Sequence, residues 1–146
     1  MAELFKHTLS EATPECYQNA RLASDWIPAL KQQRLFKLFI PKALGGLELC
    51  LMDAASFLME SAEINGSLGW LHNLASGANF FCGYFDEDTA AELFSSPEVL
   101  LSGSGAPAGR IYTGDPFLTA TGRWNFCTAA GYATHFTATA LDEQDK

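Results

Sequence analysis

The chain changes character near Pro97, and this change limits the possible folds more than any other feature. Before Pro97 the apolar residues recur at intervals of three and four, the spacing of one face of an α-helix. After Pro97, β-forming residues and glycines dominate, and Gly, Pro and Asp separate the apolar runs. The sequence therefore predicts an α+β protein with a helical domain over residues 1–96 and an antiparallel β domain over residues 97–146.

The first expected helix begins at Thr13-Pro14-Glu15, where Thr13 can cap the free backbone amides. One face of this helix carries Ala20, Ala23, Ile27 and Leu30. Pro28 interrupts the pattern, so we expect a kink or a break before Lys31. Pro41 ends the apolar run of residues 35–40, and Gly45-Gly46 then predicts a turn.

Three further helices are expected before Pro97. Asp53 is the predicted cap of the second, whose shared face is Ala55, Leu58, Met59 and Ala62. Asn65-Gly66 should end that helix, because both residues tolerate left-handed backbone geometry. The third helix starts at Ser67 and carries Leu68, Leu71, Leu74 and Ala75 inward. A short fourth helix is predicted from about residue 87 to residue 94, and four strands are predicted over 99–102, 110–113, 117–126 and 134–141.

The composition excludes several classes of function. Nine Lys and Arg against seventeen Asp and Glu give a net charge of −8, which argues against a nucleic-acid partner. The four cysteines are each more than thirty residues apart, so no metal-ligand spacing is present and no metal site is predicted. The start of the chain does not resemble a signal peptide, and no apolar run is long enough to span a membrane. A cytoplasmic location with reduced thiols is the simplest interpretation.

Three segments are candidates for binding. Residues 41–48 form either a ligand-facing loop or a connector between helices. Residues 102–109 contain three glycines and two serines, whose amides and hydroxyls can cradle an anion or a ring edge, or simply form a loop. Residues 124–128, Trp-Asn-Phe-Cys-Thr, can place an aromatic face and a hydroxyl against a planar cofactor. Alternatively, Trp124 and Phe126 pack into a core at alternate positions of a strand.

Four segments, three of which overlap these candidates, occur in a fixed order: residues 35–46, ending in Pro-Lys-Ala-Leu-Gly-Gly; residues 65–70, Asn-Gly-Ser-Leu-Gly-Trp; residues 104–109; and residues 122–128. In this order the chain resembles the acyl-CoA dehydrogenase superfamily, especially its branch of two-component flavin-dependent monooxygenases. The resemblance extends from about residue 15 to the end of the chain.

The resemblance implies a helical N-terminal domain, a central β domain and a C-terminal four-helix bundle. This chain would hold the first domain and roughly half of the second, with the bundle absent. In the family, FAD or reduced FMN lies between the β domain and the bundle. Residues matching Ser104, Phe126, Cys127 and Thr128 approach the isoalloxazine ring, and Trp124 matches a tryptophan beside it. A hydroxyl such as that of Thr128 can form a hydrogen bond near N5 of the flavin.

The chain also departs from the family pattern. The monooxygenase branch often carries a histidine shortly after the Gly-Trp pair, where this chain has Ala78-Asn79, although His72 lies nearby. The glycine usual after the Ser or Thr is Ala129, and a later histidine is replaced by Tyr132. The base of the dehydrogenases comes from the bundle. We therefore assign no catalytic residue to this chain.

Two functions follow from the resemblance. The first is the N-terminal portion of a flavin-dependent oxidoreductase that oxidises an acyl-CoA at Cα–Cβ or hydroxylates a small aromatic substrate. We expect this chain alone to be inactive and not to retain FAD. The second is a non-catalytic truncated paralogue that acts as an interaction module or as a subunit of a homo- or hetero-oligomer. A third interpretation is a soluble α+β domain whose motifs serve only packing.

Overall fold

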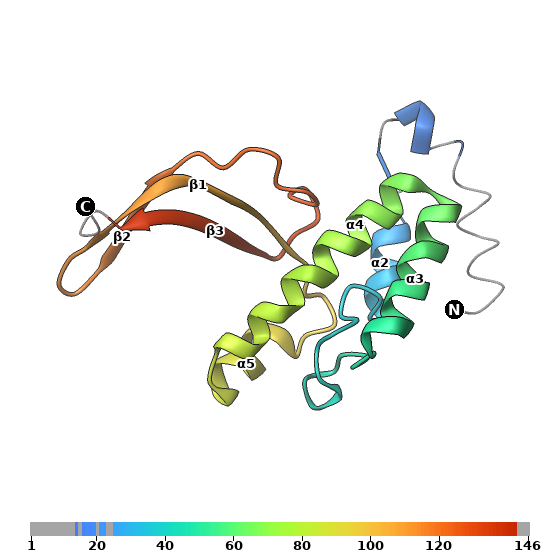
Figure 1. Ribbon diagram of the computed structural model, residues 1–146, viewed down its shortest axis with the longest axis horizontal. Helices are drawn as coiled ribbons and strands as arrows, with labels where there is room; N and C mark the ends of the chain where they lie inside the picture. Colours follow the sequence, from blue (N-terminus) through green and yellow to red (C-terminus); the bar gives the residue numbers. More distant parts are fainter. Residues whose placement is uncertain (1–13, 15, 20, 23–24, 143–146) are drawn as a thin grey trace. The chain divides into compact units, whose positions relative to one another are not determined.

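The computed structural model describes residues 14, 16–19, 21–22 and 25–142. These residues form two compact units, the first ending at Leu100 and the second beginning at Leu101 (Figure 1). The first unit is helical and the second is a small sheet, which confirms the α+β class. Four residues of the first expected helix lie outside the described residues: the cap Thr13, Glu15, Ala20 and Ala23.

Helix α2, Trp26–Gln32, contains Pro28 without interruption, so the expected break before Lys31 is wrong. The helix begins only two residues before Pro28, which places the proline in the first turn. Backbone N–H groups of the first turn have no acceptor within the helix, so the missing N–H of proline costs little there. The buried side chains of α2 are Trp26, Ile27, Leu30 and Lys31.

The segment over residues 35–40 is buried although it is neither helix nor strand. Its backbone forms hydrogen bonds with the segment that returns beside it: Leu47 N donates to Lys37 O, and Leu49 N donates to Leu38 O. Between these two segments lie the 3₁₀ helix η1, Lys42–Leu44, and Gly45, whose φ of 71° is left-handed. The turn predicted at Gly45-Gly46 is therefore confirmed.

Helices α3, Leu51–Ile64, and α4, Gly66–Gly77, pack against each other. Asp53 is not the cap of α3, because the helix begins two residues earlier, after Cys50. Asn65 does end α3, but with an extended φ of −157° and not the expected left-handed geometry, and its side chain accepts a hydrogen bond from Leu68 N to cap α4. One residue therefore ends one helix and caps the next.

The faces that α3 and α4 bury differ in part from those expected. In α3 the buried residues are Ala54 and Ser61, whereas Met59 is 66% exposed. In α4, Leu68, Leu71 and Ala75 are buried as expected, but Leu74 is exposed. The unit is completed by the 3₁₀ helix η2, Ala78–Tyr84, and by α5, Glu87–Phe94, which lies where the fourth helix was predicted.

The second unit is a three-stranded sheet in the order β2-β1-β3. Strand β1 spans Leu101–Thr113, β2 spans Leu118–Gly122 and β3 spans His135–Asp142. Strands β1 and β2 are antiparallel, but β1 and β3 are parallel, so the predicted antiparallel sheet is wrong for that pair. The physical reason is the long connection over residues 123–134, which carries the chain to the far edge of β1 before β3 begins.

Substitutions in α4 test the contact between α3 and α4. A Cβ at Gly69 would lie 2.6 Å from Ala62 Cα, whereas one at Gly77 would meet nothing within 4 Å. We expect Gly69→Ala to lower the free energy of unfolding by about 1–3 kcal/mol, because the helices must separate. The matched change Gly77→Ala should be neutral or raise it by up to about 1 kcal/mol. Urea unfolding followed by far-ultraviolet circular dichroism measures both, and equal effects would contradict the packing at Gly69.

Candidate functional site

The five predicted flavin-binding residues belong to the second unit but not to one element. Ser104 lies in β1, because residues 102–109 form part of that strand and not a loop, with an irregularity in the pairing between Ser104 and Gly109. The strand expected over residues 117–126 ends at Gly122. Trp124, Phe126, Cys127 and Thr128 therefore lie in the connection between β2 and β3.

A hydrogen bond ties this connection to β1. The Ser102 Oγ donates to the backbone oxygen of Thr128 at 2.6 Å. Ser104 is two residues further along β1, so its side chain lies on the same face of the strand as that of Ser102. The hydrogen bond therefore ties the Cys127-Thr128 segment to the start of β1, two residues before Ser104. A turn stabilises this segment, since Ala130 N donates to Cys127 O and Ala133 N donates to Ala129 O.

The backbone around Cys127 and Thr128 is strained. Phe126 and Ala129 have φ values of 60° and 70°, a left-handed region that residues with side chains rarely occupy. The Phe126 side chain is 98% exposed, so the expectation that it packs into a core is wrong. Such strain costs about 1–3 kcal/mol per residue and is often found at binding sites. The segment thus presents an aromatic ring next to a thiol and a hydroxyl.

Trp124 has a different role from the other four predicted residues. Its indole ring lies against Gly109 and Gly122, which face each other across β1 and β2, and neither position has room for a Cβ. The indole Nε1 donates to Thr139 O of β3 at 2.7 Å. The side chain therefore joins all three strands and is part of the packing of the sheet. Of the five predicted residues, Thr128 is tied through its backbone oxygen to Ser102, two residues before Ser104 in β1, whereas Trp124 contacts Gly109 further along that strand.

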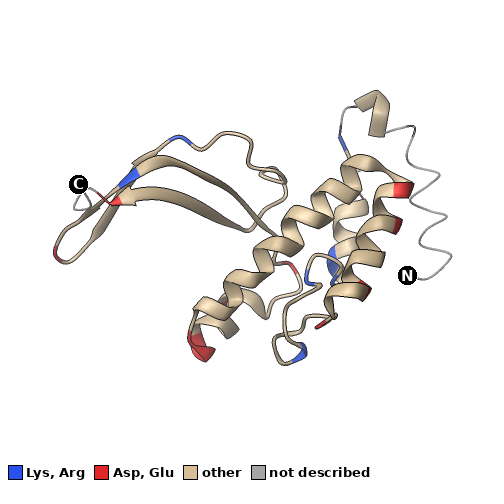
Figure 2. Ribbon diagram, in the orientation of Figure 1, with Lys and Arg blue, Asp and Glu red and all other residues tan. Residues whose placement is uncertain are grey.

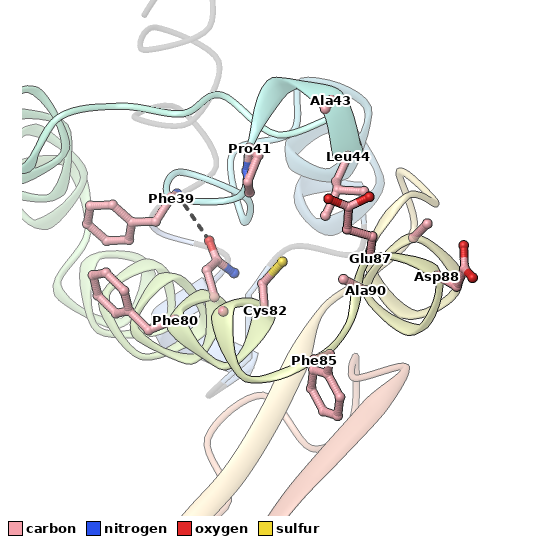
Figure 3. Close-up of a pocket in the computed structure, with 13 residues that line it drawn as sticks. Phe39, Pro41, Ala43, Leu44, Phe80, Cys82, Phe85, Glu87, Asp88 and Ala90 are labelled. Carbon is pink, nitrogen blue, oxygen red and sulfur yellow. Dashed lines mark hydrogen bonds between the residues drawn. The ribbon is translucent and has the colours of Figure 1, made fainter.

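The helical unit contains a pocket of about 780 Å³ that the sequence did not predict (Figure 3). Its walls come from η1 and the residues before it, from η2 and from α5. The lining residues are Phe39, Pro41, Ala43, Leu44, Asn79, Phe80, Cys82, Gly83, Phe85, Glu87, Asp88, Ala90 and Ala91. Part of the 41–48 segment therefore lines a pocket, and whether it faces a ligand stays a prediction. The other wall lies forty residues later, which no local pattern reveals.

Lys37 is buried beside this pocket. Its ammonium donates to Leu44 O and Ser96 O at 3.2 Å each, and to Ser95 O at 3.5 Å. Burial, together with the charge of Arg34, lowers the pKa of Lys37, while the nearby Cys82 opposes this. Burial also raises the pKa of the Cys82 thiol. Cys82 is therefore a neutral thiol near pH 7 and not an activated nucleophile.

His72 is fully buried in α4 between the rings of Phe36 and Phe57. Ser61 Oγ donates its proton to Phe57 O, so it must accept a hydrogen bond from His72 Nδ1, at 3.0 Å. His72 is therefore neutral with its proton on Nδ1, and burial lowers its pKa to about 3. His72 is thus a hydrogen-bonded structural residue of the core.

Figure 2 shows acidic residues at the start of α5, beside the pocket, and basic residues in the sheet unit. Asp86, Glu87 and Asp88 form an acidic group at the start of α5. Among residues 14–142, as far as they are described, no three His, Cys, Asp or Glu side chains gather as metal ligands. No helix in the described part of the chain is long and apolar enough to cross a membrane.

No protein-family model matches the chain. It is similar to a pigment production hydroxylase of Rhodococcus sp., with 27% identity over 129 residues, which cover 88% of this chain and 33% of that protein. It is also similar to HsaA of Rhodococcus jostii, the oxygenase subunit of a flavin-dependent monooxygenase, with 25% identity over 87% of this chain and 34% of that protein. The chain thus spans about a third of the length of the curated relatives it matches.

Solved structures share its fold. The 3-HSA hydroxylase from Rhodococcus sp. RHA1 superposes with a TM-score of 0.81 and 23% identity, over 98% of this chain and 38% of that one. XiaF from Streptomyces sp., solved in complex with FADH2 and glycerol, gives a TM-score of 0.78 and 22% identity over 97% and 37% of the two chains. The matching part of these proteins therefore has the same fold as this chain.

The buried state of His72 predicts a specific dependence of stability on pH. Its pKa falls from the ordinary 6.5 to about 3, so below pH 6.5 the unfolded chain binds a proton that the folded chain does not. The free energy of unfolding should therefore fall by roughly 1.4 kcal/mol per pH unit as the pH drops below 6.5, until the folded pKa is reached. Urea unfolding at about pH 7, 6 and 5 should show this slope in the wild type. The His72→Gln variant should lack this pH-dependent slope, and the control variant His135→Gln should keep it. An unchanged slope in His72→Gln would contradict the assignment.

Two aromatic residues of the connection are expected to differ in their effect on stability. Trp124→Ala removes the ring that joins the strands and should lower the free energy of unfolding by about 2 kcal/mol. Phe126→Gly removes an exposed ring and relieves a left-handed backbone, so it should be neutral or stabilise by up to about 1 kcal/mol. Urea unfolding of the two variants compares them directly. A destabilised Phe126→Gly variant would mean that the ring is packed in solution.

Proposed function

We propose that this chain is the N-terminal portion of a flavin-dependent monooxygenase of the acyl-CoA dehydrogenase type, which hydroxylates a small aromatic substrate with reduced flavin. The observation that carries the proposal is the similarity, over 88% of the chain, to a pigment production hydroxylase, together with the fold shared with XiaF, solved with FADH2. The matched relatives are named as hydroxylases and monooxygenases, which favours hydroxylation over acyl-CoA oxidation.

The proposed flavin-facing surface consists of Ser104, Phe126, Cys127 and Thr128. The residues fit a flavin ring in two respects. The Phe126 ring is exposed on a strained backbone and offers a flat apolar face. The hydrogen bond from Ser102 Oγ to the backbone oxygen of Thr128 ties the Cys127-Thr128 segment to the strand that carries Ser104, and the hydroxyls of Ser104 and Thr128 are the groups that would meet the polar edge of the ring. When bound, reduced flavin would supply the electrons for oxygen activation.

The other predicted residues have supporting roles in this proposal. Trp124 is a positioning residue, because its ring and its Nε1 are engaged by the three strands. His72 cannot replace the histidine that the monooxygenase branch often carries, since it is buried and its Nδ1 is bonded to Ser61. Asn79 is likewise engaged by backbone groups. Acid–base chemistry is therefore assigned to no residue of this chain.

A second candidate function, a non-catalytic interaction subunit, is favoured by the aromatic residues of η2 and the residue after it. Four aromatic side chains are exposed there: Phe80 to 62%, Phe81 to 43%, Tyr84 to 84% and Phe85 to 44%. Exposed apolar groups of this density often mark contacts between proteins. Light scattering after size exclusion separates the candidates, because an interaction subunit should associate through this surface and a Phe80→Ser/Tyr84→Ser variant should not.

Flavin binding tests the main proposal. We expect FAD fluorescence to be quenched saturably by the chain, with an affinity too weak to retain flavin after desalting. Ser104→Ala/Thr128→Ala should weaken binding about three- to tenfold, the effect of one or two lost hydrogen bonds. Thr119→Ala, an exposed position on β2, is the matched control and should bind as the wild type does. No saturable quenching, or equal weakening in the control, would contradict the proposed surface. A stoichiometric flavin complex after desalting would contradict the expected weak affinity for flavin.

A further inference from the structure

The pocket of the helical unit has mainly apolar walls (Figure 3). Phe39 and Phe80 stack with their ring centroids 4.8 Å apart and 22° between their planes, which makes one wall aromatic. Side chains of η1 and of α5, including Leu44 and Ala90, supply the remaining apolar surface. A volume of about 780 Å³ is in the range of pockets that hold small organic molecules. The walls therefore suit a ligand with an apolar, preferably aromatic, body.

Most polar groups near the pocket are already engaged within the protein. The Asn79 amide donates to Phe36 O at 3.1 Å and to Ala75 O at 3.2 Å, and its oxygen accepts from Phe39 N at 3.3 Å. The ammonium of Lys37 points at backbone carbonyls and Lys37 is 1% exposed, so it does not line the pocket. The Cys82 thiol is neutral, because burial raises its pKa. Apart from the weak S–H donor of Cys82, these groups give an anionic ligand no free donor.

The charged groups that do line the pocket are the carboxylates of Glu87 and Asp88 in the first turn of α5. Glu87 points to the end of the pocket where Leu44 lies, opposite Phe39 and Phe80, whereas Asp88 points to the outer side of α5 (Figure 3). From this arrangement we propose that the pocket binds a small arylalkylamine, a molecule with an apolar body and one ammonium group. The ammonium contacts Glu87, and the aromatic end lies against Phe80 and Cys82, away from the ammonium side.

The position of Lys37 fixes this orientation. Its positive charge acts on Cys82, so the Cys82 side of the pocket is the less favourable side for a second cation. The Glu87 side is the more favourable side for the ammonium group of the ligand, because a charge-assisted hydrogen bond to a carboxylate is stronger than a hydrogen bond between neutral groups. All residues of this site belong to the helical unit, so the site is independent of the flavin-facing surface proposed above.

The test uses three probes that differ only in their polar end: phenylbutylammonium, phenylbutanol and phenylbutanoate. Saturation-transfer NMR with the full chain measures affinity, and the rate of alkylation of Cys82 by iodoacetamide, read by peptide mass spectrometry, reports the location. We expect the amine to bind about three- to tenfold more tightly than the alcohol, and the acid to bind most weakly. The amine should slow alkylation of Cys82 but not of Cys50, which is exposed and lies outside the pocket.

Glu87→Gln and Asp88→Asn are a matched pair, since both remove one carboxylate from the first turn of α5. Glu87→Gln should abolish the preference for the amine over the alcohol, and Asp88→Asn should keep most of it. The proposal is overturned if no probe binds, if the acid binds as well as the amine, or if the amine binds without protecting Cys82. It is also overturned if the two variants lose the preference equally, because the effect would then be general acidity of the surface.

Discussion

The helical unit depends on satisfying the backbone of a buried segment that has no regular structure. Residues 35–40 lie in the core, where an unpaired N–H or C=O would cost about 1–3 kcal/mol. Asn79 meets part of this need, because it bonds both Phe36 O and Phe39 N while it also holds Ala75 O at the end of α4. Lys37 adds a second link, from the segment to η1 and to the end of α5. These two side chains fix the walls of the pocket.

The sheet unit depends on a comparable side-chain to backbone bond. The hydrogen bond from Ser102 Oγ to Thr128 O ties the connection over residues 123–134 to the start of β1. Phe126 and Ala129, on either side of the bonded segment, have left-handed backbones. Trp124 fixes the opposite part of the connection, with its ring against Gly109 and its Nε1 bonded to Thr139 O. The proposed flavin-facing surface lies between these two anchors.

Local patterns in the sequence correctly predicted those features of the fold that depend only on residues close together in the chain. The α+β class, the turn at Gly45 and the helix near Glu87 follow from spacing and from glycine chemistry. The predictions that failed depend on context. Pro28 is tolerated because α2 begins just before it. Residues 102–109 belong to a strand because β3 pairs with residues 102–104 and with Gly109, where β2 joins on the other side. The parallel pairing of β3 depends on a crossover that no local pattern encodes. The pocket also escaped prediction, because Phe39 and Phe80 meet across forty residues.

The central claim is that the flavin-facing surface of this chain is the Ser104 side of β1 together with residues 126–128. Chemical-shift mapping of the labelled chain with FMN and with FAD tests it most directly, because each backbone amide reports separately. The account predicts that the amides of Ser104, Phe126, Cys127 and Thr128 shift with flavin concentration, while those of β2 and of α5 do not. Shifts confined to the helical unit, or none at saturating flavin, would contradict it.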